Sequence, residues 1–224
     1  SQKPSSLLAV EIIKKQSRYG RSLKRVGDII FSLLVLTLGS PIFIFIGILV
    51  KLSSPGSVFY VQKRVGRNYR EFGCIKFRTM YKDADDLLPN LLDKYPLMRK
   101  EFEKDFKLRK DPRITKLGRF LRRSSLDELP QFFNVLKGEM SIVGPRPEVN
   151  KYVELYNQEQ KEVLSIKPGI TDYASLEYFE ENKLLGESSN PEETYINEIM
   201  PKKLEINLKY IKKHSFLTDL NIIW

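Results

Sequence analysis

The stretch that decides the fold runs from Ile29 to Val50 and reads IIFSLLVLTLGSPIFIFIGILV. None of its 22 residues carries a charge. A straight helix of this length would be about 33 Å long, which is enough to cross the hydrocarbon core of a bilayer. One soluble core rarely hides a helix that has no polar face, so the sequence predicts that this segment enters a membrane.

A break interrupts the apolar segment near its middle, at Gly39-Ser40-Pro41. Proline removes one hydrogen bond from a helix and clashes with the preceding turn, so a kink or a break is expected there. The hydroxyl of Ser40 can satisfy a backbone group that the break frees. Ser40 and Pro41 are therefore the predicted membrane break.

Positive charge lies on both sides of this segment. The net charge of +10 is concentrated in residues 1–25, with seven Lys and Arg against one Glu, and in residues 51–82, with eight against one. Because Lys and Arg favour the cytoplasmic side, equal charge at both ends favours a re-entrant hairpin over a single span. The alternative is a non-catalytic protein that uses its basic flanks to bind a membrane surface or a nucleic acid.

The composition limits the residue types that can take part in catalysis. The chain has 224 residues, one cysteine and one histidine. This length is enough for one sizeable domain with a hydrophobic core. A single cysteine excludes an internal disulfide, and a single histidine leaves little material for a His-based metal site or a Ser-His pair. Catalytic work is therefore expected from carboxylates, lysine or hydroxyls.

Hydrophobic patterns predict an α+β fold that is mostly helical. Residues 1–25 resemble a basic interfacial helix, residues 26–52 the re-entrant hairpin, and residues 53–224 a catalytic domain. Alternating apolar residues on both sides of residues 66–68 predict a small β-hairpin. Helical spacing predicts helices over residues 83–110, 115–123, 129–136, 148–164 and 202–213. Together these elements would surround an active site on the cytosolic side.

An acidic pair, Asp127 and Glu128, lies between a basic run and Pro130. Ser125 and Glu128 have capping-box spacing, so the pair taken alone can be no more than an acidic helix start. Pro130 argues against a helix that begins at Ser125, because proline is tolerated only in the first turn. The helix is therefore expected to begin near the acids, with the two carboxylates pointing in different directions.

Basic residues surround this pair and indicate a site that handles phosphate. They are Lys76, Arg78, Arg113, Lys116, Arg119, Arg122, Arg123 and Arg146. Arginine grips phosphate oxygens with two hydrogen bonds, and Mg²⁺ typically takes one or two carboxylates together with substrate phosphates. A carboxylate can also attack phosphorus and form an acyl phosphate. Asp127 and Glu128 are therefore candidates for either role, as Mg²⁺ ligands or as a nucleophile.

Several motifs follow one another along the chain. In order they read KRVGDIIFSLLVLTLGSP, SPGSVFYVQKRVGRN, IKFRTM, DPRITKLGRFLRRSSLDELPQFFNVLKGEMSIVGPRPE, KPGIT and SFLTDL. In this order the motifs resemble the bacterial sugar transferases, whose small members are monotopic phosphoglycosyl transferases. The resemblance covers most of the chain.

The resemblance implies a reaction and a location. A sugar 1-phosphate would pass from a UDP-sugar to undecaprenyl phosphate with release of UMP, as the first membrane step of glycoconjugate synthesis. The enzyme would sit in the bacterial inner membrane with its active site facing the cytoplasm. Membrane lipid would be a further partner, no nucleic acid is expected, and a homodimer is compatible with the sequence.

The resemblance also implies roles for individual residues. Asp127 would be the nucleophile that forms a covalent phosphosugar intermediate, and Glu128 would be its partner, either as a Mg²⁺ ligand or as a base. Roles in binding the phosphates or the nucleotide sugar fall to Lys76, Arg122, Arg146 and Asp219. One segment departs from the pattern: small members often follow PGIT with GWAQVNGRN, whereas this chain reads PGITDYASLEYFEENKLLG. A different sugar-contacting or lid element is therefore expected over residues 177–200.

Overall fold

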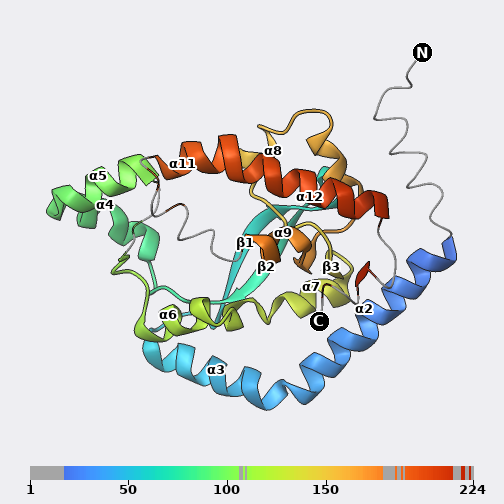
Figure 1. Cartoon of the computed structure of the whole chain (residues 1–224). Coiled ribbons are helices and arrows are strands. Elements are labelled where there is room, and N and C mark those ends of the chain that lie inside the picture. The colour runs from blue at the N-terminus through green and yellow to red at the C-terminus, as the bar shows by residue number, and fades with distance from the viewer. Residues whose placement is uncertain are drawn as a thin grey trace.

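The structure is a computed structural model that describes residues 18–105, 108, 110–178, 185, 188, 190–213, 218, 219 and 222. Two helices, α2 (Arg18–Leu38) and α3 (Ser40–Ser53), lie along one side of the molecule. Figure 1 shows these two helices below, the strands and short helices in the middle, and α12 (Met200–Lys213) above. The middle tier therefore lies between an apolar helix pair and a long amphipathic helix.

The bend between α2 and α3 lies where the sequence predicts a break. The two helices meet at an angle of 62° across Gly39. Ser40 Oγ donates to the carbonyl of Thr37 at 2.8 Å, and Pro41 lies in the first turn of α3, where no backbone donor is needed. No single helix in the described part of the chain is long and apolar enough to cross a membrane, whereas this bent pair together is.

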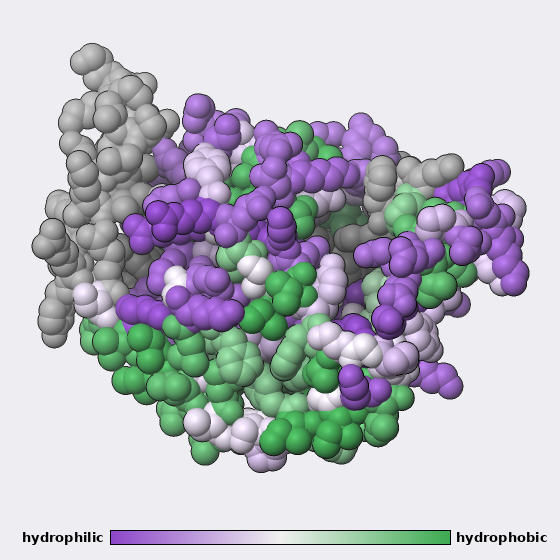
Figure 2. Space-filling model, turned by 180° about the vertical axis from the view of Figure 1, so that it is seen from behind, coloured by the Kyte–Doolittle hydropathy of each residue, from purple (hydrophilic) through white to green (hydrophobic). Residues whose placement is uncertain are grey.

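The bent pair exposes a large apolar surface. Figure 2 shows this surface as a green area along the lower edge of the molecule. Its exposed apolar side chains are Leu23, Val26, Ile30, Phe31, Leu33, Leu34, Leu38, Ile42, Ile44, Phe45, Ile48 and Leu52. A contiguous apolar surface of this kind is rare on soluble monomers and marks a contact with lipid or with another protein.

The strands form two small sheets. β1 (Phe59–Val65) and β2 (Glu71–Phe77) pair antiparallel with Tyr60 opposite Lys76, which confirms the predicted hairpin. β3 (Ser141–Val143) and β4 (Gly169–Thr171) pair in parallel, and the sequence did not predict this second sheet. The polar edge of β2 is covered by α7 (Gln131–Lys137), because Asn134 accepts from Ile75 N at 3.0 Å and donates to Gly73 O at 2.7 Å.

Short helices connect these sheets. The α-helices are α4 (Ala84–Lys94), α5 (Pro96–Asp105), α6 (Lys116–Arg123), α7, α8 (Asn150–Val153), α9 (Tyr173–Glu177) and α11 (Pro191–Thr194), and the tighter or wider turns are η1 (Arg67–Tyr69), η2 (Leu126–Glu128), η3 (Gln160–Ser165) and η4 (Tyr195–Ile199). The helices predicted over residues 115–123, 129–136 and 202–213 are therefore present, with ends that differ by at most two residues. The helical segment predicted over residues 83–110 is divided at Tyr95 into α4 and α5 where the chain is described.

The helix predicted over residues 148–164 is wrong. The chain forms α8, then a turn, then η3. Asn157 Oδ1 accepts from Gln160 N at 2.8 Å, and Gln160 Oε1 accepts from Asn157 N at 2.9 Å. These side chains satisfy the backbone locally and compete with a continuous helix.

One predicted domain limit, between residues 25 and 26, falls inside α2, and the other, between residues 52 and 53, falls at the end of α3. The division of the chain into these domains stays a prediction. Residues 1–17, which form most of the predicted interfacial helix, lie outside the described residues.

Polar anchors hold the bent pair against the rest of the molecule. At the base of α2, Lys24 donates to a β3 carbonyl and pairs with Asp219, while Arg25 donates to two carbonyls at the end of α7. Asp28 is buried and accepts from the hydroxyl and a backbone N–H of β3. At the other end, Arg78 donates to carbonyls of residues 54 and 55, just after α3. Contacts with β3, α7, Arg78 and Asp219 therefore set the orientation of the bent pair.

One face of α3 also packs on the core. Ile46 and Val50 are buried against Phe77 of β2 and Leu121 of α6. A larger core lies between α7, β3, η3 and α12. The cluster around α3 brings the end of β2 and the end of α6 to the side of the molecule that carries the apolar surface.

Candidate active site

The acidic pair occupies a short turn between α6 and α7. Ser125 has a left-handed backbone (φ 56°), Asp127 and Glu128 lie in η2, and Pro130 immediately precedes α7. The helix therefore begins after the acids, as the position of Pro130 predicts. Because η2 is a tight turn, the two adjacent carboxylates leave it in different directions.

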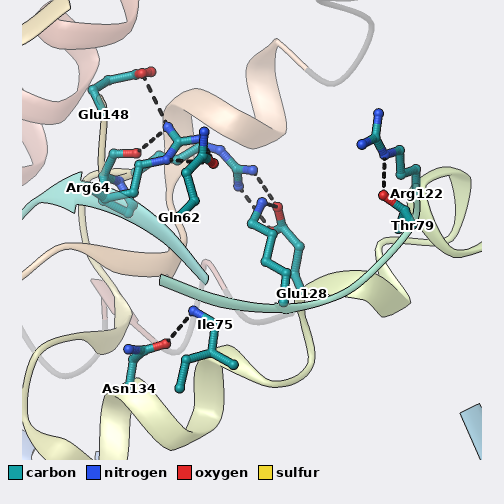
Figure 3. A network of polar contacts seen from close by, with 11 residues as sticks. Gln62, Arg64, Ile75, Thr79, Arg122, Glu128, Asn134 and Glu148 are labelled. Carbon is teal, nitrogen blue, oxygen red and sulfur yellow. Dashed lines mark hydrogen bonds and ion pairs between the residues drawn. The ribbon is translucent and has the colours of Figure 1, made fainter. Parts of the chain in front are cut away.

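Glu128 is held by two cations. Lys76 Nζ donates to Glu128 Oε1 at 2.6 Å. Arg146 donates from Nη2 to the same oxygen at 2.5 Å and from Nη1 to Oε2 at 3.2 Å. Figure 3 shows dashed contacts at the carboxylate of Glu128. Burial alone would raise the pKa of Glu128, but Arg146 and then Lys76 overcome that effect and lower it to about 2. Glu128 is therefore ionised throughout the physiological pH range.

The surroundings of Asp127 differ from those of Glu128. Asp127 is 9% exposed. Among the described residues, no cation lies within 4 Å of its carboxylate. Burial raises the pKa of Asp127, Lys76 partly opposes that shift, and the neighbouring Glu128 adds to it. A buried carboxylate without a counter-ion is more basic than an exposed one, and such groups concentrate at functional sites.

Arg122 lies beside Asp127 and is held by a hydroxyl. Its Nε donates to Thr79 Oγ1 at 2.8 Å, as Figure 3 shows. Burial lowers the pKa of Arg122, and the negative charge of Asp127 raises it, so the two side chains interact electrostatically. Its pKa is nonetheless far above neutrality in proteins, so Arg122 carries a positive charge next to Asp127.

The loop Gly144-Pro145-Arg146-Pro147 is fixed by contacts to its backbone. Arg146 N donates to Asp172 Oδ2 at 3.1 Å, and Arg64 Nη1 donates to Pro147 O at 3.0 Å. Glu148 follows the loop, pairs with Arg64 at 3.5 Å and accepts from Tyr195 OH at 2.7 Å. The position of the Arg146 guanidinium is therefore set by β1, by Asp172 and by η4.

Sequence reasoning missed the residues that support this loop. Asp172 is 1% exposed, caps α9 through Ser175 N and accepts from Asn207, so it joins three elements. Arg64 and Glu148 pair although they lie on different elements. Asp172 directly follows the KPGIT motif and Arg64 lies in QKRVG, so their positions within motifs were the available signal.

The structure brings most of the predicted site residues together. Lys76, Arg122, Asp127, Glu128 and Arg146 converge from β2, α6, η2 and the loop before α8. Asp219 lies elsewhere: it pairs with Lys24 and accepts from Tyr210 OH at 2.6 Å at the base of α2. Its role in binding the donor stays a prediction, and its observed contacts anchor α2.

Two other basic residues near the site have structural contacts. Arg78 donates to carbonyls just after α3, and Arg113 is buried in an ion pair with Asp111 at 2.7 Å.

Ser40 and Pro41 lie at the bend of α2 and α3. A different sugar or lid element is expected over residues 177–200, of which most of residues 179–189 lie outside the described residues and the later part forms α11 and η4.

The described residues do not form a metal site from protein ligands alone. No group of three or more His, Cys, Asp or Glu side chains among them could hold a metal ion. Mg²⁺ usually takes only one or two carboxylates and completes its shell with water and substrate phosphates. The donor set fits this pattern, because among the described residues no cation lies within 4 Å of the Asp127 carboxylate and Arg146 is the one donor to Glu128 Oε2.

The sequence of the chain is similar to those of known sugar transferases. The profile of the bacterial sugar transferase family matches residues 19–224. The undecaprenyl-phosphate galactose phosphotransferase of Salmonella typhimurium is 47% identical over 71% of this chain and 33% of its own length. The UDP-glucose:undecaprenyl-phosphate glucose-1-phosphate transferase of Escherichia coli K12 is 38% identical over 93% of this chain and 40% of its own length.

A third relative is covered more fully. The exopolysaccharide production protein ExoY of Sinorhizobium fredii is 36% identical over 90% of this chain and 82% of its own length. By contrast, the chain spans about a third of the length of the Salmonella relative. The profile match covers nearly all of the chain, including every residue that converges on the acidic pair. The chain therefore belongs to the bacterial sugar transferase family.

Proposed function

We propose that this chain transfers a sugar 1-phosphate from a UDP-sugar to undecaprenyl phosphate and releases UMP. The observation that carries the proposal is the contrast between adjacent acids. Glu128 is paired with two cations, whereas no cation of the described residues lies within 4 Å of the Asp127 carboxylate, which interacts with Arg122 at longer range. The names of the Salmonella and Escherichia relatives describe transfers of this kind to undecaprenyl phosphate.

In the first half-reaction Asp127 is the nucleophile. Its carboxylate oxygen attacks the phosphorus that carries the sugar, a new P–O bond forms, and the phosphoanhydride bond breaks. UMP leaves with the electron pair of that bond, and an aspartyl phosphosugar remains. Burial makes the carboxylate of Asp127 more basic and so a stronger nucleophile. The free amino groups of Arg122 are placed to bind the charged phosphate.

In the second half-reaction the lipid phosphate replaces Asp127. A phosphate oxygen of the acceptor attacks the same phosphorus, and the Asp127 carboxylate leaves with the electron pair of the acyl phosphate. The attacking oxygen is already anionic and needs no proton removed. Glu128 is a poor general base because its pKa is lowered to about 2 by Arg146 and Lys76. We therefore assign Glu128 to orienting these two cations.

Mg²⁺ is the proposed cofactor. Asp127 and Glu128 would supply its carboxylate oxygens, and the donor diphosphate would supply the other anionic ligands. When bound, the ion neutralises the charge of the diphosphate.

The bent pair is proposed to be a re-entrant membrane hairpin. Its length and composition, its 62° bend and its exposed apolar side chains all favour insertion from one side of the bacterial inner membrane. Since α3 packs on the ends of β2 and α6, the acids would lie at the cytoplasmic surface of that membrane, within reach of a lipid phosphate. Surface labelling of single cysteines at Ser22 and Ser57 in intact cells, with Cys74 replaced by alanine, tests this topology. External labelling of either position would overturn it.

The covalent step provides the direct test of the proposed reaction. The protein is incubated with a panel of UDP-sugars and Mg²⁺ but without acceptor lipid. We expect a burst of UMP no larger than the amount of enzyme, and a mass increase of one sugar phosphate on the peptide that contains Asp127. Adding polyprenyl phosphate should then remove the adduct.

Two results would contradict the proposal. Release of UMP only when acceptor is present, with no adduct at any time, would exclude the covalent step. Absence of UMP release from every UDP-sugar in the panel, with acceptor and Mg²⁺ present, would exclude the reaction. The Asp127→Asn protein is the control and should form no adduct.

A further inference from the structure

We propose that Thr79 is a positioning residue that aims the guanidinium of Arg122 at a phosphate of the donor. The inference rests on the proposed function, because it assigns Arg122 a phosphate ligand. Thr79 lies two residues after β2 and is 6% exposed. Its side-chain oxygen accepts from Arg122 Nε at 2.8 Å across 43 residues of sequence.

The contact leaves the phosphate-binding end of Arg122 free. Among the described residues, Thr79 is the hydrogen-bond partner of the Arg122 side chain, and it engages only Nε. Arginine binds phosphate best with two parallel N–H groups, and both terminal amino groups of Arg122 are available for this. The side chain is only partly buried, so a ligand can reach it.

Thr79 is itself held rigidly against the first turn of α6. Its carbonyl accepts from Thr115 N at 3.0 Å and from Thr115 Oγ1 at 3.4 Å, and Thr115 caps α6 through Gly118 N at 2.8 Å. A Cβ at Gly118 would lie 1.9 Å from that same carbonyl oxygen. Only glycine therefore permits this approach of Thr79 to the helix.

This packing also determines where Arg122 lies. Residues four apart lie on the same face of a helix, so Arg122 follows Gly118 by one turn on the face that contacts Thr79. The backbone of Thr79 fixes the position of α6, and its hydroxyl fixes the guanidinium that α6 presents. Figure 3 shows Thr79 and Arg122 facing each other at one end of the site, apart from the contacts of Glu128.

The chemical nature of the partner explains why a hydroxyl is used. Two other arginines near the site, in contrast, have carboxylate partners: Arg113 pairs with Asp111 and Arg146 with Glu128. A carboxylate at position 79 would neutralise Arg122 and compete with a phosphate for it. A neutral hydroxyl restricts the side chain and leaves its full charge for the ligand.

The test compares Thr79→Val, which keeps shape and loses the hydroxyl, with Thr79→Ser, which keeps the hydroxyl. We measure kcat/KM for the UDP-sugar, and the Kd of UDP in the absence of turnover. Thr79→Val is expected to lower kcat/KM about tenfold and to raise the Kd of UDP about tenfold. For Thr79→Ser both values should stay within about twofold of those of the unchanged protein. In an Arg122→Met background, Thr79→Val should cause no further loss, because the group that it positions is gone.

Ser124→Ala is the matched control. Ser124 lies at the end of the same helix, and its hydroxyl donates to the carbonyl of Phe120, not to Arg122. We expect this variant to bind UDP as the unchanged protein does, and all variants to melt at similar temperatures. Equal losses from Thr79→Val with and without Arg122 would overturn the proposal, and so would failure of Thr79→Ser to retain binding.

The binding measurement separates this inference from the proposed reaction. If the unchanged protein binds UDP, Thr79→Val weakens that binding and no UDP-sugar yields UMP, the positioning role stands and the transfer reaction fails. If the unchanged protein turns over UDP-sugars and Thr79→Val leaves both UDP binding and kcat/KM unaltered, the reaction stands and the positioning role fails. If the unchanged protein does not bind UDP, the positioning role also fails.

Discussion

Two neighbouring parts of the active site satisfy their charges in different ways. In the ion-paired half, Glu128 is held by Lys76 and Arg146. In the open half, Asp127 and Arg122 interact at a distance, and Thr79 is the only side chain that restrains the arginine in the described structure. The two halves are joined by one peptide bond between Asp127 and Glu128.

The difference separates groups that build the site from groups that react. Charges that cancel one another inside the protein are stable and leave little binding capacity for a ligand. Charges without an internal partner cost stability, which a ligand or a reaction step can recover. The ion-paired half is therefore expected to be mainly a scaffold, in which Glu128 also offers an oxygen to Mg²⁺, and the open half is expected to contact the phosphates.

The substitution Asp127→Asn tests the open half and has the largest expected effect. Removing a nucleophile should lower the rate of UMP release by at least about 10⁴-fold. The melting temperature should stay the same or rise, because burial raises the pKa of Asp127 and so makes its charged form costly in the folded state. Rate and melting temperature are measured on the same preparation. A variant that loses stability in proportion to activity would assign Asp127 to the scaffold.

The second substitution, Lys76→Met, removes one of the two cations of the ion-paired half. It leaves Glu128 with Arg146 alone and removes the positive charge that opposes the raised pKa of Asp127. We expect a loss of about 2 kcal/mol in the free energy of unfolding and about 100-fold in kcat/KM.

Lys63→Met is the control for this variant. Lys63 is exposed on the neighbouring strand β1, opposite Gly73. Replacing it should change neither stability nor rate. If Lys76→Met lowered the rate and left stability unchanged, Lys76 would belong with the reacting groups, and the division into two halves would have to be redrawn.

The sequence predicted the parts of this site that depend on local physics. Pro130 placed the start of α7 after the acids, alternation gave the β1–β2 hairpin, and Pro41 marked the bend. Each is a steric or periodic effect that acts over a few residues. The residues that build the site are therefore largely visible in the sequence, as the convergence around Glu128 shows.

The partners of those residues were not predictable, because the contacts are long-range. Lys76 lies 52 residues from Glu128, and Thr79 lies 43 from Arg122. Asp219 pairs with Lys24 across 195 residues, so motif membership alone did not reveal its place at the base of α2. The β3–β4 pair has three residues in each strand, too few for a periodic signal, and tertiary contacts decide its existence.

The smallest expected effect is a shift of the acid limb of the pH–rate profile in Glu128→Gln. Asp127 must be ionised to attack, and its pKa is raised above the ordinary value of 3.8, so kcat/KM should fall as the pH drops through that raised pKa. Glu128 itself does not titrate there, since its pKa is about 2. The substitution removes a negative neighbour and frees Lys76, and both changes lower the pKa of Asp127. The limb should therefore move to lower pH, even if the plateau rate also falls. A limb that stays in place would show that the titrating group is not Asp127, and a limb that moves to higher pH would show that Lys76 and Arg146 lose their positions once Glu128 no longer holds them.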